Sequence, residues 1–356
     1  MKHWKKLLSL ALTLALALSL AGCGKTDPQD TGAEDQTQTE EQTEEPVSES
    51  YSIAALKGPT AMGLVKLMSD TDEKAAQMLD SSKPYEGEVG NLYTFTLAAS
   101  ADEVSPLLMK GELDMACVPA NLAAVLYQKT EGDIVTLAVN TLGVLYIVEN
   151  GNAVTSMADL AGKTIVASGK GSTPEYALRY LLSENGLDPD ADVTIDWKSE
   201  HSECVTALAT GAATIAMLPQ PFVTVAENKI SGLRTALDLT EQWDALDNGS
   251  ALLTGVIVAR REVVEANPDA VDAFLKDYAG SVEWVNANPA DAAELIGSYG
   301  IVEAAVAEKA LPHCNIVCIT GAEMKDKLSG YLQVLFDADA SSVGGALPGD
   351  DFYYGA

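Results

Sequence analysis

Two short turns in this sequence combine the residue types that small-solute sites use. Lys57-Gly58-Pro59-Thr60 ends an apolar run, and Lys170-Gly171-Ser172-Thr173 ends a second one about a hundred residues later. Helical spacing of apolar residues follows both turns. Glycine lets the backbone approach a ligand closely, while hydroxyl groups and lysine offer hydrogen bonds and positive charge. The residues of both turns are therefore candidate contacts to a small polar solute.

The position of these turns favours a binding role. In an open parallel sheet, ligands bind beyond the carboxyl ends of the strands, where the following helices present unpaired N–H groups. One exposed helix end stabilises a bound charge by only about 0.3–1 kcal/mol. A micromolar Kd corresponds to a binding free energy of roughly −8 kcal/mol. We therefore expect both turns to face one cleft. Ordinary connections with surface lysines are the alternative, and contact through the side chains of Lys57 and Lys170 themselves is left open.

A duplicated segment indicates that the chain folds as two related halves. The stretch "LLMKGELDMACVPANLAAV" (107–125) aligns with "ALATGAATIAMLPQPFVTV" (207–225), with the glycine and the proline of the two copies in register. Each copy predicts the end of a helix, a glycine C-cap, a short strand, a proline and a second helix. Alternating strand and helix signals predict an α/β fold whose parallel sheets are covered by helices.

Further candidates follow from their positions at predicted strand ends and crossings. Asn121 and Gln220 come shortly after the prolines of the duplicated strands, and each amide can donate and accept hydrogen bonds. His201 lies where a strand leads into the helix of the second copy. Helix caps, hinge positions and solvated side chains are the alternatives. The additional candidate contacts are Pro119, Asn121, Asn140, Thr141, His201, Pro219, Gln220 and Gly255.

Two apolar strand signals, at 135–150 and 250–261, bracket the second copy. They predict one lobe inserted into another through a pair of crossings. Helical patterns at 262–286, 289–299 and about 321–336 then complete the first lobe. The expected organisation is lobe 1 at 51–140 plus 254–340, lobe 2 at 141–253, and a loose C-terminal tail at 341–356.

The beginning of the sequence is typical of an export signal. Lysines precede an apolar stretch too short to span a bilayer comfortably, so residues 1–22 are predicted to be a signal peptide. Leu-Ala-Gly-Cys resembles a bacterial lipobox, in which the cysteine is lipidated, and Cys23 is the expected anchor. An ordinary signal with an incidental cysteine is the alternative. Residues 23–50 predict an acidic disordered tether. We expect a lipid-anchored protein on the extracytoplasmic side of the cell membrane.

The composition argues against several other classes. A formal net charge of −30 is unfavourable for nucleic acid, since phosphate contacts need clustered lysine and arginine. Four scattered cysteines besides Cys23 do not make a disulfide scaffold. Cys314 and Cys318 lie in a stretch that alternates like a strand, beside His313. We favour buried thiols over a metal site there, and we leave their redox state open. No metal or cofactor is expected.

These features resemble the type II periplasmic-binding-protein fold, α/β with two Rossmann-like lobes joined by a two-strand hinge. Within that fold, the chain is similar to the NitT/TauT group (nitrate, sulfonate and taurine; NMT1/THI5-like) of ABC-transporter substrate-binding lipoproteins. The resemblance covers about 51–340 and rests on the lipobox and on "ALKGPTAMGLVKL", "GELDMACVPAN", "NTLGVLYIVEN", "MADLAGKTIVASGKGSTPEYAL" and "GAATIAMLPQPFV". It implies a monomer that captures a small solute between its lobes and delivers it to a membrane permease coupled to an ATPase.

The resemblance leaves the ligand open. No arginine stands in the candidate loops, so a bidentate clamp on sulfonate or nitrate is in doubt. A zwitterionic, weakly anionic or neutral heterocyclic solute is an equal alternative. Two other function classes compete with solute capture: a surface sensor or interaction lipoprotein, and an enzyme of pyrimidine-synthesis or menaquinone-pathway type on the same fold. Against an enzyme, the sequence has no GxSxG, HExxH or P-loop motif.

Overall fold

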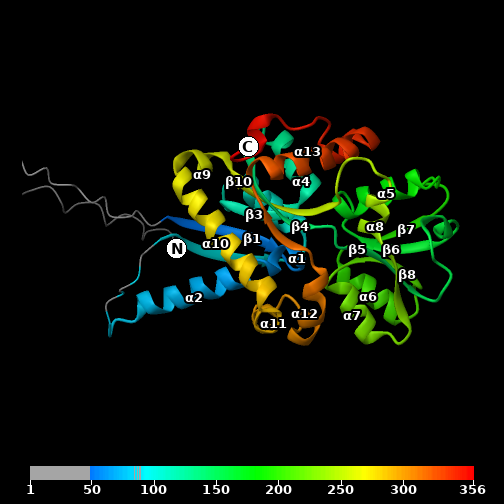
Figure 1. Ribbon diagram of the computed structural model, residues 1–356, viewed down its shortest axis with the longest axis horizontal. Coiled ribbons are helices and arrows are strands. Elements are labelled where there is room, and N and C mark those ends of the chain that lie inside the picture. Colours follow the sequence, from blue (N-terminus) through cyan, green and yellow to red (C-terminus); the bar gives the residue numbers. More distant parts are fainter. Residues whose placement is uncertain (1–48, 84, 86, 88–89) are drawn as a thin grey trace, which may run out of the picture. The chain divides into compact units, whose positions relative to one another are not determined.

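The computed structural model describes residues 49–83, 85, 87 and 90–356 (Figure 1). The expected signal peptide, Cys23 and all but the last two residues of the expected tether lie outside the described residues. Among the helices of the described part, none is long and apolar enough to cross a membrane. Both sheets of the fold belong to one unit that comprises residues 46–356.

The first sheet has six strands in the order β11-β4-β10-β3-β1-β2. β1 pairs in parallel with β2 and β3, whereas β10 runs antiparallel to both β3 and β4. The carboxyl ends of β1, β3 and β4 therefore meet at one edge, where β10 begins. The strands are β1 (Ser50–Leu56), β2 (Leu92–Ala98), β3 (Met115–Pro119), β4 (Ile134–Leu142), β10 (Leu253–Arg260) and β11 (Ile316–Ile319).

The second sheet has five strands in the order β7-β6-β8-β5-β9. β6 pairs in parallel with β7 and β8, and β5 runs antiparallel to β8 and β9. The carboxyl ends of β6, β7 and β8 therefore share an edge with the start of β5. The strands are β5 (Leu145–Asn150), β6 (Thr164–Ser168), β7 (Thr194–Lys198), β8 (Ile215–Pro219) and β9 (Leu233–Asp238).

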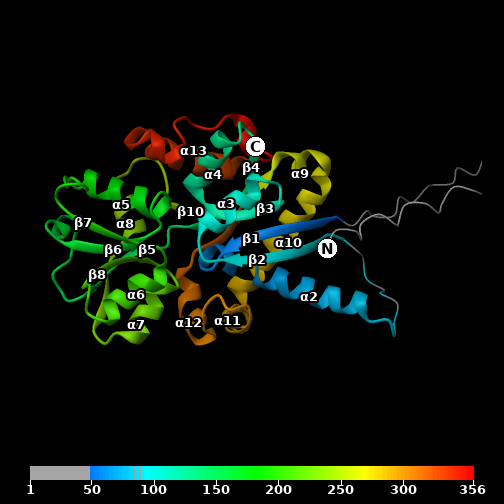
Figure 2. The same ribbon diagram turned by 180° about the vertical axis from the view of Figure 1, so that it is seen from behind.

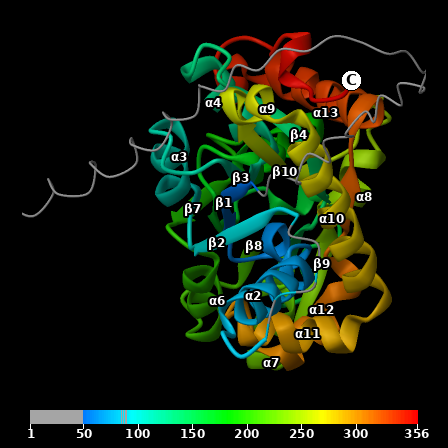
Figure 3. The same ribbon diagram turned by 90° about the vertical axis from the view of Figure 1, so that its left-hand side faces the viewer.

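Helices cover both faces of the first sheet, and together they make up lobe 1. One face packs against α3, α4 and α13, while the other packs against α2, α10 and α11. Figure 3 shows α4 and α13 on one side of the strands, and α2 and α11 on the other. The helices are α1 (Pro59–Met62), α2 (Val65–Leu79), α3 (Ala101–Met109), α4 (Ala120–Lys129), α9 (Arg261–Ala266), α10 (Pro268–Ala287), α11 (Pro289–Ser298), α12 (Ala304–Ala310) and α13 (Gly321–Ala338).

The second sheet and its helices make up lobe 2. Figures 1 and 2 show α5 and α8 on one face of this sheet, and α6 and α7 on the other. The α5 and α8 face shares a continuous apolar core with the α4 and α13 face of lobe 1. The helices are α5 (Thr173–Glu184), α6 (His201–Ala209), α7 (Phe222–Lys229) and α8 (Leu239–Asp244). Short 3-10 helices η1 (Met157–Leu160), η2 (Leu311–His313), η3 (Ala340–Val343) and η4 (Asp350–Phe352) complete the chain.

The duplication predicted from the sequence is present in the structure. The first copy forms α3, β3 and α4, and the second copy forms α6, β8 and α7. Gly111 and Gly211 end the first helix of each copy with φ of 73° and 74°. Only glycine adopts a left-handed backbone conformation without a steric cost, which explains the glycine in both copies. The predicted α/β fold with two sheets is confirmed.

The crossings between the lobes differ from the sequence prediction. The apolar stretch 135–150 is not one strand, because it breaks after β4 at Gly143 and continues as β5 in the other sheet. A Cβ on Gly143 would lie 2.1 Å from Thr240 Oγ1, so the first residue of the crossing must be glycine for α8 to pack there. The chain returns through residues 245–252 before β10 begins.

The C-terminal segment is not the loose tail that the sequence suggested. Val343 and Phe352 are fully buried, and the rings of Phe352 and Tyr127 lie 5.3 Å apart in an edge-to-face contact. Arg261 forms an ion pair with Asp351 at 2.8 Å. The glycines and aspartates of this segment suggested a tail, but its few aromatic and apolar side chains anchor it to lobe 1.

Two local predictions need correction. The helix after the first turn begins at Pro59 rather than after Thr60, since proline suits the first helical position and the Thr60 hydroxyl donates to Leu56 O at 3.2 Å. Cys314 follows η2 and precedes β11, so it does not share a strand face with Cys318. Both thiols are free; Cys314 is buried and Cys318 is half-buried.

Candidate functional site

The edge of the first sheet brings several predicted residues together. Gly255 pairs with Pro119 of β3 and with Thr141 of β4. A Cβ on Gly255 would lie 2.6 Å from both Asn140 Oδ1 and the methyl group of Thr60. Asn140 Nδ2 donates to Thr60 O at 3.4 Å, and its Oδ1 accepts from the Thr141 hydroxyl at 3.1 Å. These residues form a packed platform under the first turn, and both polar atoms of Asn140 are engaged within it.

The first turn lies on this platform. Gly58 has φ of 153°, a conformation that side chains rarely adopt, and it precedes α1. The backbone N–H of Lys57 donates to Ala98 O at 2.9 Å, which fixes the turn to the end of β2. The Lys57 side chain is exposed and, among the described residues, has no ion-pair partner. Its charge is therefore available to a solute.

The edge of the second sheet carries His201 at the start of α6. The hydroxyl of Ser168, the last residue of β6, lies 2.5 Å from His201 Nδ1, and the Phe222 ring packs 5.0 Å from the imidazole. Burial lowers the pKa of His201 to about 4, so the ring is neutral near pH 7. Within the described part of the chain, its Nε2 makes no hydrogen bond. His201 thus presents one neutral polar nitrogen that is free for a further partner.

Gln220 lies directly after β8, at the same end of the second sheet as His201. Its Oε1 accepts from the Thr224 hydroxyl at 3.0 Å, and its backbone N–H donates to Val144 O at 3.0 Å, next to the first crossing. No described residue accepts a hydrogen bond from its Nε2. The side-chain amide of Gln220 is therefore held by its oxygen, with the nitrogen left as a donor. Pro219 pairs with Leu145 at the same edge.

The second turn satisfies much of its own polar backbone. The N–H of Gly171, which has φ of 77°, donates to Glu175 Oε2 at 2.6 Å, and the Ser172 hydroxyl donates to Gly169 O at 2.8 Å. The Lys170 side chain is exposed and, like that of Lys57, has no ion-pair partner in the described residues. The Gly171 amide, expected to face a ligand, thus donates to the Glu175 carboxylate of α5, the helix that follows the turn.

One direct contact joins predicted residues of the two lobes. The Thr173 hydroxyl at the start of α5 donates to Asn121 Oδ1 in α4 at 3.3 Å. No hydrogen bond or ion pair between described residues connects the turn at Lys57–Thr60 with the turn at Lys170–Thr173. Asn121 and Thr173 therefore meet each other, and we find no such contact between the two lysine-glycine turns themselves.

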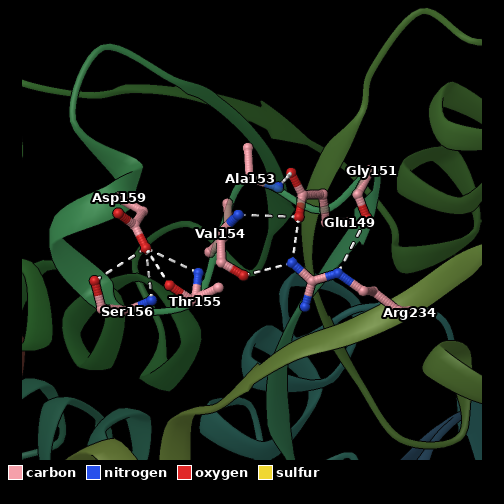
Figure 4. A network of polar contacts seen from close by, with 8 residues as sticks. All are labelled: Glu149, Gly151, Ala153, Val154, Thr155, Ser156, Asp159 and Arg234. Carbon is pink, nitrogen blue, oxygen red and sulfur yellow. Dashed lines mark hydrogen bonds and ion pairs between the residues drawn. The ribbon is translucent and has the colours of Figure 1, made fainter.

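Arginine takes no part in this region. All four arginines of the chain form ion pairs elsewhere: Arg179 with Asp190, Arg234 with Glu149, Arg260 with Asp114 and Arg261 with Asp351. Arg260 ends β10 and so lies at the opposite end of the first sheet from Gly255. Figure 4 shows Arg234 in a network with Glu149 and the loop that follows β5. The candidate region therefore offers neutral hydrogen bonds and two exposed lysines, without a guanidinium.

Two further features of the described residues bear on the site. No group of three or more His, Cys, Asp or Glu side chains there is arranged to hold a metal ion. A depression on the surface of lobe 2 contains none of the candidate residues and is lined by Lys198, Ser202, Glu203, Thr206, Ala207 and Thr210.

Sequence reasoning missed the residues that support the candidates. Ser168 was recognisable as the end of a strand before a glycine turn, by the same rule that identified the turns. Phe222 could have been suspected from the proline-rich start of α7. Tyr331 of α13 contacts Thr173, and Ser342 of the C-terminal segment accepts a hydrogen bond from Asn121 through its backbone oxygen. Nothing in the local pattern indicates that this segment returns to the lobe boundary.

Comparisons with known proteins agree with the geometry. The YtlA protein of Bacillus subtilis (strain 168), named as a binding protein, is 25% identical over 126 residues. That match spans 35% of this chain and 36% of YtlA. An ABC transporter structure from Parabacteroides distasonis superimposes with a TM-score of 0.67 at 23% identity, covering 85% of this chain and 98% of that one.

The alkanesulfonate-binding protein SsuA from Xanthomonas axonopodis pv. citri, bound to MOPS, gives a TM-score of 0.63 at 17% identity, covering 85% of this chain and 96% of that one. At these identities the structural likeness establishes the fold. The sequence model of the NMT1-like family matches residues 61–298, which is most of the described chain. The chain therefore belongs to the NMT1-like family.

Proposed function

We propose that this protein is the extracytoplasmic solute-binding component of an ABC importer. It captures a small polar solute between its two lobes and delivers the solute to a membrane permease coupled to an ATPase. One observation carries the proposal: the carboxyl-end edges of two sheets, joined by the short crossing at Gly143, present loops with unused donors and exposed lysines. Edges of this kind are where open α/β sheets bind ligands. Family membership and the solved relatives support it.

The contacts we assign to the solute are those whose polar groups are not used within the protein. In lobe 2 these are His201 Nε2 and Gln220 Nε2, supplemented by Lys170. In lobe 1 they are the Lys57 side chain and the backbone N–H of Gly58, whose carbonyl oxygen already accepts from Ala61. The remaining candidates position these groups: Pro59, Thr60, Pro119, Asn140, Thr141, Gly171, Ser172, Pro219 and Gly255.

The solute is small and polar, and no arginine clamps it. The relative SsuA binds alkanesulfonate, but in this chain every arginine is committed to an ion pair outside the site. A neutral imidazole and a carboxamide hold neutral or zwitterionic groups by hydrogen bonding. The positive charges of Lys57 and Lys170 extend the range of solutes that the site can bind to weak anions. We further propose that lipidation at Cys23 keeps the protein, as a monomer, on the outer side of the membrane.

A thermal-shift screen tests solute capture. Millimolar amino acids, sulfonates, nitrate, pyrimidines and vitamins are added singly, because a ligand at a hundred times its Kd stabilises the folded state by about 2.7 kcal/mol. We expect at least one solute to raise Tm by several degrees. Calorimetry with that solute then compares His201→Ala and Gln220→Ala with Gln333→Ala, an exposed glutamine of α13.

Each of the two site variants is expected to weaken binding about 3–10-fold, the usual value of one hydrogen bond. Gln333→Ala is expected to bind like the wild type. A screen without any stabilising solute would count against solute capture. Binding that is indifferent to both site variants would place the site elsewhere.

A further inference from the structure

A short chain of hydrogen-bonding side chains lies behind His201 in lobe 2. Ser168 is the last residue of β6, and Cys204 follows His201 by three residues in α6. Both are buried, with exposed fractions of 2% and 0%. The Ser168 hydroxyl lies 2.5 Å from His201 Nδ1 and also within hydrogen-bonding reach of the Cys204 thiol. The thiol in turn lies 3.8 Å from Glu200 O, to which it donates weakly.

This chain determines which nitrogen of the His201 ring carries the proton. The ring is neutral near pH 7, because burial lowers its pKa to about 4. A neutral imidazole has one N–H donor and one acceptor nitrogen. If the Ser168 hydroxyl donates to Nδ1, the proton of the ring is on Nε2, which is then a donor. If Nδ1–H donates to Ser168, Nε2 is an acceptor. The direction of this one hydrogen bond therefore sets what Nε2 offers to a solute.

The direction follows from the acceptors available to the Ser168 hydroxyl. In the part of the chain that the structure describes, its partners are His201 Nδ1 and Cys204 Sγ. An unprotonated imidazole nitrogen is an ordinary acceptor, whereas a thiol sulfur is a weak one. With a proton on Nδ1, the buried hydroxyl would have to donate to the sulfur, and a buried donor without a good acceptor is costly. Donation from Ser168 to Nδ1 is therefore the more stable arrangement, and Nε2 carries the N–H.

The Gln220 amide is fixed in the same sense. Its Oε1 accepts from the Thr224 hydroxyl at 3.0 Å and from the Thr224 N–H at 3.4 Å. This pairing leaves the Nε2 group, which can only donate. The exposed ammonium group of Lys170 is likewise a donor without acceptor capacity. The three side chains that we assign to the solute in lobe 2 therefore all offer hydrogen-bond donors.

We propose that Ser168 holds His201 as a hydrogen-bond donor, and that the lobe 2 edge consequently selects solutes by an acceptor group. A carboxylate or carbonyl oxygen can accept from His201 Nε2–H, Gln220 and Lys170. An ammonium or another group that only donates would leave these donors unpaired. Ser168 is a positioning residue, since it acts on the solute through the imidazole. The solute class rests on the proposed function, whereas the position of the ring proton does not.

Nitrogen NMR of the full chain with nitrogen-15-labelled histidine reads the position of the ring proton directly. Protonated and unprotonated ring nitrogens resonate far apart, and at roughly pH 8 an exposed histidine is neutral as well. His201→Ala identifies the signals of His201. In the wild type we expect His201 Nδ1 at the position of an unprotonated nitrogen and Nε2 at that of a protonated one. A proton on Nδ1 would overturn the proposal without recourse to any variant.

Two variants separate the role of the hydroxyl from that of the sulfur. Ser168→Ala is expected to lower the ratio of the Nε2–H form to the Nδ1–H form roughly 3–10-fold, the usual value of one hydrogen bond. Cys204→Ala is expected to leave that ratio unchanged, because the hydroxyl does not donate to the sulfur. A changed ratio in Cys204→Ala, or an unchanged one in Ser168→Ala, would contradict the assignment. The wild-type and Cys204→Ala spectra decide the question even if Ser168→Ala fails to fold.

Ser202→Ala is the matched control for these variants. Ser202 follows His201 directly in α6, but it is exposed and its hydroxyl donates to the Glu200 side chain at 3.1 Å. We expect its ratio of the two ring forms to equal that of the wild type. A shift as large as that of Ser168→Ala would show that the ring responds to any loss of a nearby hydroxyl, and would refute the role of Ser168.

Acetate and methylammonium test the solute class, since acetate only accepts hydrogen bonds and methylammonium only donates them. Millimolar acetate is expected to shift the His201 Nε2 signal, whereas methylammonium at the same concentration leaves it in place. The exposed ring of His313 reports any non-specific effect of the salts. An Nε2 signal that responds to methylammonium, or to neither probe, would refute selection by an acceptor group. If a solute in the thermal-shift screen nevertheless stabilises the protein, solute capture stands and only the acceptor class fails.

Discussion

Replacing Arg234 with methionine is expected to lower the free energy of unfolding by about 2–4 kcal/mol, because it leaves a buried carboxylate without its charged partner. The Glu149 side chain is only 5% exposed and forms an ion pair with Arg234 at 2.6 Å. It also accepts the backbone N–H groups of Ala153 and Val154 at 3.0 and 3.1 Å, and Arg234 Nε donates to Gly151 O at 3.0 Å (Figure 4). Together these bonds close the loop that leaves β5.

The pH dependence of stability provides a second readout of the same pair. Burial by itself raises the pKa of Glu149, but the Val154 and Ala153 N–H groups and the Arg234 guanidinium outweigh it and lower the pKa overall. A lowered carboxyl pKa contributes stability that is present above the unfolded value of about 4.5 and is lost as pH falls through the folded value. Because Arg234→Met removes one of the groups that lower the pKa of Glu149, it is expected to reduce the loss of folding stability at acid pH.

A matched control comes from a second ion pair of the same length. Arg179 and Asp190 also lie 2.6 Å apart, but the Asp190 side chain is 73% exposed. Arg179→Met is therefore expected to lower the free energy of unfolding clearly less than Arg234→Met does. Urea unfolding at pH 7 compares both variants with the wild type. Equal losses for Arg179→Met and Arg234→Met would contradict the argument from burial.

Replacing Cys23 with serine is expected to abolish incorporation of an alkynyl palmitate probe in cells. Acyl chains anchor a protein by burying methylenes at about 0.8 kcal/mol each, and two chains are needed for stable binding. Under the proposed lipidation, loss of the Cys23 thiol therefore removes both the label and the lipid anchor. The measurement is in-gel detection of the probe after immunoprecipitation of the full chain.

Cys117→Ser is the control for this labelling, since Cys117 is fully buried in β3 and inaccessible to acylation. We expect it to be labelled like the wild type. Label that persists in Cys23→Ser, or a wild-type chain that never takes up the probe, would refute lipidation at Cys23.

The repeated units could be predicted from the sequence because their signals are local. The glycine and proline of each copy mark a helix end and a strand end, and the structure forms α3, β3 and α4 from the first copy and α6, β8 and α7 from the second, in the same order. Turn chemistry and apolar spacing operate over a few residues, so they are visible without tertiary context. The two lysine-glycine turns were located between strand and helix for the same reason.

Features that depend on distant packing could not be predicted in the same way. The apolar run 135–150 looks continuous, and only the approach of Thr240 to Gly143 divides it between two sheets. The hydrogen bonds of the Asn121 amide with Thr173 and with Ser342 O, more than two hundred residues away, have no local signal in the sequence. The sequence of the glycine-rich C-terminal segment gave no local sign that the Phe352 ring packs against Tyr127 and anchors the segment to lobe 1.

A crystal structure of the protein with the solute that raises Tm most would test the central claim directly. Our account predicts density for that solute in contact with both sheet edges: with His201 or Gln220 in lobe 2, and with the turn at Gly58 in lobe 1. Solute density that contacts only one lobe, or that lies on a surface away from these sheet edges, would contradict our account.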